Sequence, residues 1–196
     1  MIDGMAQRIA SFLVERGAVA SEDADVQVYG LQVILSTSIN LLVSLLFSML
    51  MGQFLFGLSL LAAFMLLRRF TGGYHANSYL GCFVSLQAMM LLGFALQRLF
   101  CSGLSAAVVY GMLAVSLLLV YLLAPIDHAN KPSTPVSQIK FRNLSRGLAA
   151  AMAALACLGC VTLGPTNWVV GIAAGLLSTG VLLVMAKIQK KGGALS

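Results

Sequence analysis

The sequence is poor in charged residues. Only 9% of its 196 residues are charged, whereas 60% are hydrophobic. A soluble domain usually carries about 25% charged residues, and a soluble fold of this size has no means of burying so much apolar surface. The composition therefore excludes an ordinary soluble domain and predicts an integral membrane protein.

Acids, cysteines and ligand-binding motifs are also scarce. Asp127 is the only acidic residue after Asp25, and the first long apolar run, from Leu31, has no signal-peptide cleavage site after it. The four cysteines lie in or beside apolar segments, which argues against a secreted disulfide framework. Cys157 and Cys160 form a CxxC, but no third ligand is near, so packing is the favoured role. We expect no metal and no cofactor.

Long apolar segments are what the sequence has in abundance. A spanning helix needs about 20 apolar residues. The segment 54–67 is short, although the side chains of Arg68 and Arg69 can extend it toward the interface, and 79–97 is polar enough to be re-entrant or tilted. We predict an all-α polytopic fold with about six transmembrane helices, in one membrane domain over residues 21–196. The six segments are 31–51, 54–67, 79–97, 104–124, 147–164 and 167–186.

An amphipathic helix precedes this domain, within residues 1–20. Apolar residues such as Met5, Ile9 and Phe12 recur at helical spacing over residues 1–16, and Gly17 is expected to end the helix. Such a helix lies in the plane of the membrane interface. The alternative is a soluble arm packed on the protein's own loops.

The positive charge indicates the orientation in the membrane. The net charge is +6, and the basic residues lie between the apolar segments. With six spans and a cytoplasmic N-terminus, eleven of the twelve basic residues face the cytoplasm and only Arg98 faces outward. We therefore predict that both termini and the loop at about residues 68–82 are cytoplasmic. The basic residues are expected to contact anionic lipid and not nucleic acid.

The polar break at residues 68–82 carries the candidate chemistry. It contains His75 and, seven residues later, Cys82. A nearby imidazole and a helix N-terminus both favour the thiolate form of cysteine. Seven residues along one straight helix span roughly 10.5 Å, so His75 must fold back, with Gly72 and Gly73 supplying the freedom. The alternative is a histidine that contacts headgroups and a cysteine that only fills space.

Two further stretches bear on the prediction. Residues 125–143 form the longest polar connection and contain Asp127, His128 and Lys131. Gly171 and Gly175 form a GxxxG step, which favours close packing of helices within the chain or, alternatively, between two chains.

Two motifs resemble a known family. The sequence Arg-Arg-Phe-Thr-Gly-Gly-Tyr-His-Ala from Arg68, with a cysteine seven residues after the histidine, is similar to the accessory gene regulator protein B (AgrB) family. The Ala-Pro-x-Asp…Asn-Lys-Pro stretch at 124–132 resembles the central loop of that family. The resemblance implies a membrane-embedded cysteine endopeptidase of bacterial quorum sensing. Such an enzyme cuts a small propeptide at its C-terminal side and helps to cyclise the product into an autoinducing peptide.

The resemblance also implies roles for particular residues. His75 and Cys82 correspond to the catalytic pair, and the motif arginine and glycine correspond to Arg68 and Gly73, with Arg69 and Gly72 as neighbouring alternatives. The resemblance further suggests a homodimer in the bacterial cell membrane.

The sequence leaves several questions open. Asn77, Gln87, Asp127 and His128 are candidates for a third catalytic group, and a dyad without one is also compatible. Basic residues such as Arg68, Arg69 and Lys131 either attract an acidic propeptide tail or only determine topology. A non-catalytic transporter or channel, or a scaffold for a partner, is the rival function.

Overall fold

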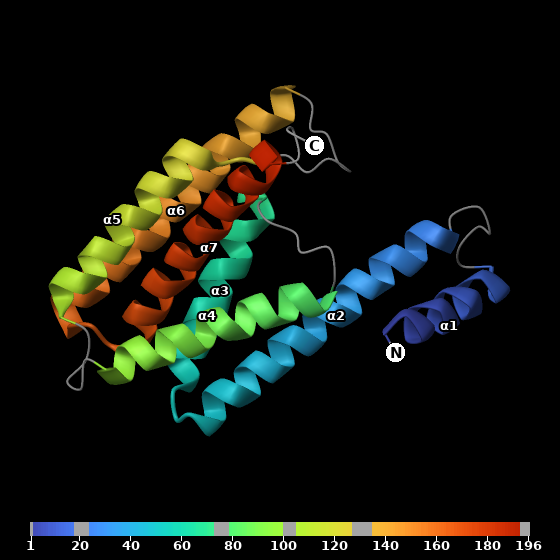
Figure 1. Ribbon diagram of the computed structural model, residues 1–196, viewed down its shortest axis with the longest axis horizontal. Coiled ribbons are helices and arrows are strands. Elements are labelled where there is room, and N and C mark those ends of the chain that lie inside the picture. The colour runs from blue at the N-terminus through green and yellow to red at the C-terminus, as the bar shows by residue number, and fades with distance from the viewer. Residues whose placement is uncertain (1, 18–23, 73–78, 100–104, 127–134, 193–196) are drawn as a thin grey trace. The chain divides into compact units, whose positions relative to one another are not determined.

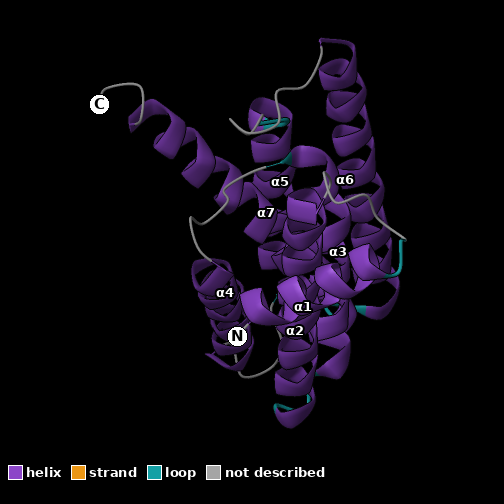
Figure 2. Cartoon of the chain, turned by 90° about the vertical axis from the view of Figure 1, so that its right-hand side faces the viewer, coloured by secondary structure: helices purple, strands orange, loops and turns teal. Residues whose placement is uncertain are grey.

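The chain folds as helices throughout the part that the structure describes. In a computed structural model, this part comprises seven helices and no named strand (Figures 1 and 2). The predicted all-α class is therefore confirmed. The described residues are 2–17, 24–72, 79–99, 105–126 and 135–192.

Five of the described helices are long and apolar enough to cross a membrane, in agreement with the predicted membrane protein. A sixth helix, α4 (Tyr79–Leu99), has a shorter apolar stretch among its described residues, Phe83–Ala95. The five long helices are α2 (Ala24–Leu50), α3 (Phe54–Thr71), α5 (Ala106–Leu123), α6 (Pro135–Leu163) and α7 (Asn167–Gly192).

The chain divides into two compact units, Met1–Leu46 and Phe47–Ser196. In the first unit, the predicted amphipathic helix is present as α1 (Ile2–Glu15). Gly17 follows it with a φ of 69°, as expected for a glycine that ends a helix.

One edge of α1 has small residues that are buried. Ala6 and Ala10 are buried, and the side-chain amide of Gln32 on α2 donates to Asp3 Oδ1 at 2.9 Å. The apolar residues Met5, Ile9 and Phe12 remain exposed. Position at the lipid interface stays a prediction for this flank.

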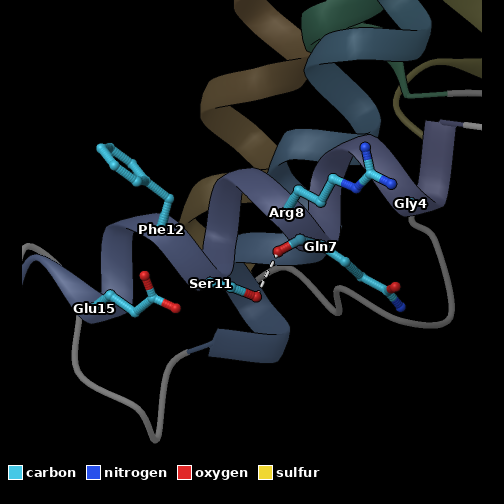
Figure 3. A pocket seen from close by; sticks show the side chains of 6 residues that line it. All are labelled: Gly4, Gln7, Arg8, Ser11, Phe12 and Glu15. Carbon is cyan, nitrogen blue, oxygen red and sulfur yellow. Dashed lines mark hydrogen bonds between the residues drawn. The ribbon is translucent and has the colours of Figure 1, made fainter.

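Mostly polar residues of α1, together with Phe12, line an open hollow (Figure 3). Within it, Ser11 Oγ donates to the Gln7 carbonyl at 2.9 Å. A single helix supplies every lining residue, so the hollow offers little enclosure for a ligand. The lining residues are Gly4, Gln7, Arg8, Ser11, Phe12 and Glu15.

In the second unit, α7 is the central helix and packs against α3, α5 and α6 (Figure 1). Every residue from Val169 to Leu176 is buried. Because lipid tails are as apolar as leucine, helices in a membrane associate chiefly through close packing, and small residues allow it. The glycine and alanine content of α7 therefore explains its central position.

The predicted GxxxG step forms the contact between α7 and α3. Gly171 faces the Phe56 carbonyl, and a Cβ atom on Gly175 would lie 2.6 Å from the Leu60 carbonyl oxygen. These contacts confirm the role in packing within the chain. We refer to the contact around Gly171 and Gly175 as the α3–α7 seam.

Three helices of this unit run in the same direction. Gly171 and Gly175 on α7 contact successive turns of α3, which makes α3 and α7 parallel, and α3 ends beside the residues that follow α5. Residues 73–104 must therefore carry the chain back between the two ends of the bundle. As a helix of 21 residues, α4 is about 31 Å long, enough to cross a hydrocarbon core of about 30 Å. Six crossings remain the predicted topology.

The predicted polar connection at 125–143 is too long. Helix α6 begins at Pro135, so residues 135–143 are helical and extend α6 beyond the predicted span 147–164. Proline is well suited to the first helical position, because it has no N–H that needs a partner and its φ is already helical. The basic residues Lys140, Arg142 and Arg146 are therefore within the first four turns of a helix.

Candidate functional site

The last turn of α3 carries the first residues of the polar break. Arg68 is half-buried and its guanidinium carbon lies 5.4 Å from the centre of the Phe64 ring, whereas Arg69 is exposed. Cations at the C-terminus of a helix interact favourably with the helix dipole. Thr71 is completely buried, and its hydroxyl donates to the Gly72 carbonyl at 3.2 Å.

Gly72 joins this turn to the segment after α5. Gly72 and Ile126 form an isolated parallel β-bridge, in which the Ile126 N–H donates to the Thr71 carbonyl at 3.0 Å. The backbone of Gly72 has φ 66° and ψ −142°, which residues with a side chain rarely adopt. A Cβ atom at this position would also collide with the Ile126 carbonyl oxygen. Glycine is therefore required at position 72 for two separate reasons.

The contact between Thr71–Gly72 and Ile126, which we call the joint, connects the two sequence motifs. The first motif begins at Arg68 and the second at Ala124, more than fifty residues later. The sequence indicated that the adjacent glycines give freedom to bend, but it gave no sign that one of them pairs with the second motif. The two motifs therefore lie next to each other at the joint.

Cys82 is the fourth residue of α4 and therefore lies in its first turn, near a helix N-terminus as the sequence predicted. The positive end of the α4 dipole is the expected aid to thiolate formation there. Gln87, one of the candidates for a third group, lies on the same helix more than one turn later. Four predicted site residues lie outside the described residues, as does the side chain of Cys82. They are Gly73, His75, Asp127 and Lys131.

The cysteines of α6 are placed as packing residues. Cys160 is buried and Cys157 is half-buried. Among the residues that the structure describes, no group of three histidine, cysteine or acidic side chains is close enough to hold a metal ion. The predicted packing role of the CxxC agrees with this arrangement.

An arginine on α6 binds the end of α5, which the sequence did not indicate. Arg146 Nη2 donates to the Tyr121 carbonyl at 2.6 Å, and the guanidinium carbon lies 4.8 Å from the centre of the Tyr121 ring. Tyr121 is in the last turn of α5, five residues before Ile126. No spacing rule connects residues this far apart, so only the fold reveals the pair.

Comparison with known proteins gives one match. The model of the family described as accessory gene regulator B matches residues 6–185. No curated protein and no solved structure matches the chain. The match includes the polar break, the joint and all of the five long apolar helices except the last turns of α7.

Proposed function

Since this chain belongs to the accessory gene regulator B family, we propose that it is a membrane cysteine endopeptidase that cleaves and cyclises a small propeptide. The family takes part in processing the quorum-sensing peptide of the accessory gene regulator system. The observation that carries the finer proposal is the joint. The joint holds the two motifs together at one end of the helical bundle. Cys82 is in the first turn of the next helix, α4.

The first half of the proposed reaction forms an acyl-enzyme. His75 takes the proton of the Cys82 thiol, and the thiolate attacks the scissile carbonyl of the propeptide. The C–N bond then breaks, and the protonated His75 returns its proton to the leaving amine. The N-terminal part of the propeptide is left as a thioester on Cys82.

The second half closes the ring. A thiol or hydroxyl of the bound peptide gives its proton to His75 and attacks the thioester carbonyl, which expels the Cys82 thiolate. A thiol nucleophile exchanges one thioester for another, so little free energy is lost, whereas hydrolysis would release it. A site at the membrane edge that excludes water favours cyclisation over hydrolysis.

The joint bears on the choice of a third catalytic group. Asp127 follows Ile126 directly, and His75 is the third residue after Gly72, so both residues start from the joint. Gln87 is on α4 and does not start there. Of the other candidates near the joint in sequence, Asn77, Asp127 and His128, only Asp127 is a carboxylate, the usual partner of a catalytic imidazole. We therefore favour Asp127 as the carboxylate that orients His75, with Arg68, Arg69 and Lys131 as binding residues for an acidic part of the propeptide.

The charge distribution supports a cytoplasmic site. The end of α3 and the start of α6 are at the same end of the bundle, because Arg146 near the start of α6 contacts the end of α5 and the joint connects α5 to α3. Most basic residues of the described bundle gather there, on the last turn of α3, on the first four turns of α6 and on the last turns of α7, which runs parallel to α3. Positive charge marks the cytoplasmic side of a membrane protein.

Co-expression with the cognate propeptide tests the proposal. We expect the propeptide to be encoded by a short reading frame beside the gene for this protein. Cys82→Ala and His75→Ala are each expected to reduce cleavage at least about 10³-fold, because each removes an essential partner of the nucleophilic step. Mass spectrometry of the peptide products measures cleavage and ring closure together.

Cysteine variants of α6 provide the matched control. Cys157→Ala makes the same chemical change at a half-buried position that has no predicted role in catalysis. It is expected to leave cleavage within about twofold. Full cleavage by Cys82→Ala at normal protein levels would reject the endopeptidase and favour a transporter or scaffold.

A further inference from the structure

We propose that Arg146 is a positioning residue for catalysis, because it fixes the end of α5 and thereby the joint on which the catalytic bend depends. This inference rests on the proposed function. It assigns to Arg146 a role beyond that of a basic residue that determines topology. The role depends on contacts with Tyr121 and not on contact with the substrate.

The contacts of Arg146 involve the weakest part of α5. The last carbonyl groups of a helix have no partner within the helix, and the dipole gives that end a partial negative charge. Arg146 Nη2 donates to one of these carbonyls, that of Tyr121, while the guanidinium lies over the Tyr121 ring. The two contacts together bind the end of α5 to α6.

A short, well-packed segment connects this anchor to the joint. The Ala124 N–H donates to the Val120 carbonyl at 3.0 Å, and Ala124 is buried. Two residues later, the Ile126 N–H donates to the Thr71 carbonyl. A displacement of the Tyr121 backbone is therefore expected to displace Gly72 as well. Misplacement of reacting groups by 1 Å can reduce a rate about 10²-fold.

A role in topology does not explain where this arginine lies. Arg142, one turn earlier on α6, is exposed, as is Lys140. Arg146 is half-buried instead, and its Nε atom is buried without a hydrogen-bond partner among the described residues. Burial of a charged group is unfavourable and adds nothing to the positive-inside signal. The planar guanidinium can stack on a ring and donate at the same time, which a lysine cannot reproduce.

The first experiment compares two variants with the same change in charge. Arg146→Gln is expected to lower kcat for propeptide cleavage by about 10-fold to 100-fold, with KM within about threefold. Arg142→Gln, on the same helix, is expected to leave both constants within about threefold. The inference is wrong if the two variants change cleavage equally or if Arg146→Gln changes only KM. In either case the positive charge, and not the contacts with Tyr121, would explain the effect on cleavage.

A charge-retaining variant separates the contacts from the charge. Arg146→Lys keeps the net charge and the topology signal. It loses the planar guanidinium, which stacks on the Tyr121 ring and donates to the Tyr121 carbonyl at the same time. It is expected to recover less than about a third of the kcat that Arg146→Gln loses. Complete recovery would overturn the inference, because charge would then be sufficient.

Hydrogen exchange gives a readout that does not require activity. In the full-length protein in nanodiscs, the Ile126 amide is expected to exchange at least about 10-fold faster in Arg146→Gln than in the parent or in Arg142→Gln, because the bond to Thr71 opens more often. Amides of Val169–Leu176 are expected to stay protected. Unchanged exchange at Ile126, or equal loss of protection in α7, would overturn the inference.

The two readouts keep the two proposals distinguishable. Absence of cleavage by the parent protein would refute the proposed function, while exchange at Ile126 would still report whether Arg146 holds the joint. Normal cleavage by the parent, together with normal kcat in Arg146→Gln, would refute the positioning role alone.

Discussion

The α3–α7 seam and the joint use the same device at two places in the second unit. In each, a glycine allows a backbone carbonyl to approach so closely that a Cβ atom would collide with it: Gly175 against Leu60, and Gly72 against Ile126. The seam lies in the interior of the bundle. The joint lies at the end of the bundle, where the two sequence motifs begin.

The surroundings of the two contacts differ, and so does their expected importance. At the seam, large buried side chains such as Leu60 and Leu176 enclose the glycines, so a change there disturbs packing on all sides. At the joint, the described residues Thr71 and Ile126 share a single backbone hydrogen bond. The seam is therefore expected to determine whether the bundle forms, and the joint to determine where the catalytic groups lie.

The largest effect is expected from Gly175→Leu. The new side chain would force α3 and α7 apart, since the Leu60 carbonyl and Ala63 Cβ would lie 2.6 Å and 3.0 Å from its first carbon. We expect a loss of about 3 kcal/mol or more of stability and little folded protein. Thermal unfolding in detergent and size-exclusion chromatography measure this.

Gly111→Leu is the control for that variant. Gly111 on α5 is exposed, and no atom of the described residues lies within 4 Å of the place where its Cβ would be, so the same substitution should be tolerated. Equal destabilisation by the two variants would show that leucine acts through helix propensity or insertion and not through the seam.

A smaller effect on stability, but a clear effect on cleavage, is expected from Gly72→Ala. The strained backbone and the collision with Ile126 together should open the joint at a cost of roughly 1–3 kcal/mol. Cleavage of the propeptide should fall about 10-fold or more while the folded bundle persists.

Gly52→Ala separates strain from collision. Gly52 also has a positive φ, 69°, but its Cβ would meet open space among the described residues. It is expected to lose some stability and to keep most of its cleavage rate. A cleavage defect as large as that of Gly72→Ala would mean that the joint has no special importance.

The smallest effect is expected from Gly180→Ala. Its Cβ would meet a side chain, that of Leu119, at 2.9 Å, and not a backbone carbonyl. A change of rotamer moves the contacting Cδ1 atom of Leu119 away, the Leu119 Cβ at 3.2 Å needs only a shift of a few tenths of an ångström, and alanine favours the helix by up to about 1 kcal/mol over glycine. The net change in unfolding free energy should be about 1 kcal/mol or less, by thermal unfolding. A change as large as that of Gly175→Leu would contradict the distinction between backbone and side-chain contacts.

The sequence was sufficient to predict the parts of the fold that depend on periodicity and composition. Apolar length predicted the spanning helices, the spacing of Met5, Ile9 and Phe12 predicted α1, and GxxxG predicted the seam. The end of the polar connection was wrong because residues 135–143 were assigned to it, although Pro135 begins α6, as proline often begins helices.

The site was harder to predict for a physical reason. The predicted apolar segment 79–97 agrees with α4, which places Cys82 near a helix N-terminus, since helix starts have local signals. The joint and the Arg146–Tyr121 contact connect residues that are distant in sequence, and neither has a periodic pattern. Their hydrogen bonds and ring contact do not alter the composition or the periodicity of the sequence, so they are found only when the helices are placed in space.

The joint also sets an order of events at the ribosome. Between Gly72 and Ile126 the chain leaves the site end, returns through α5 and only then completes the pairing. Arg146 emerges twenty residues after Ile126, which is roughly 1–4 s at typical rates of synthesis. A nascent chain that has already inserted α3 and α4 therefore still lacks the paired segments. The proposed peptidase is therefore expected to be inactive during its own translation without an inhibitory segment, because its joint is not yet formed.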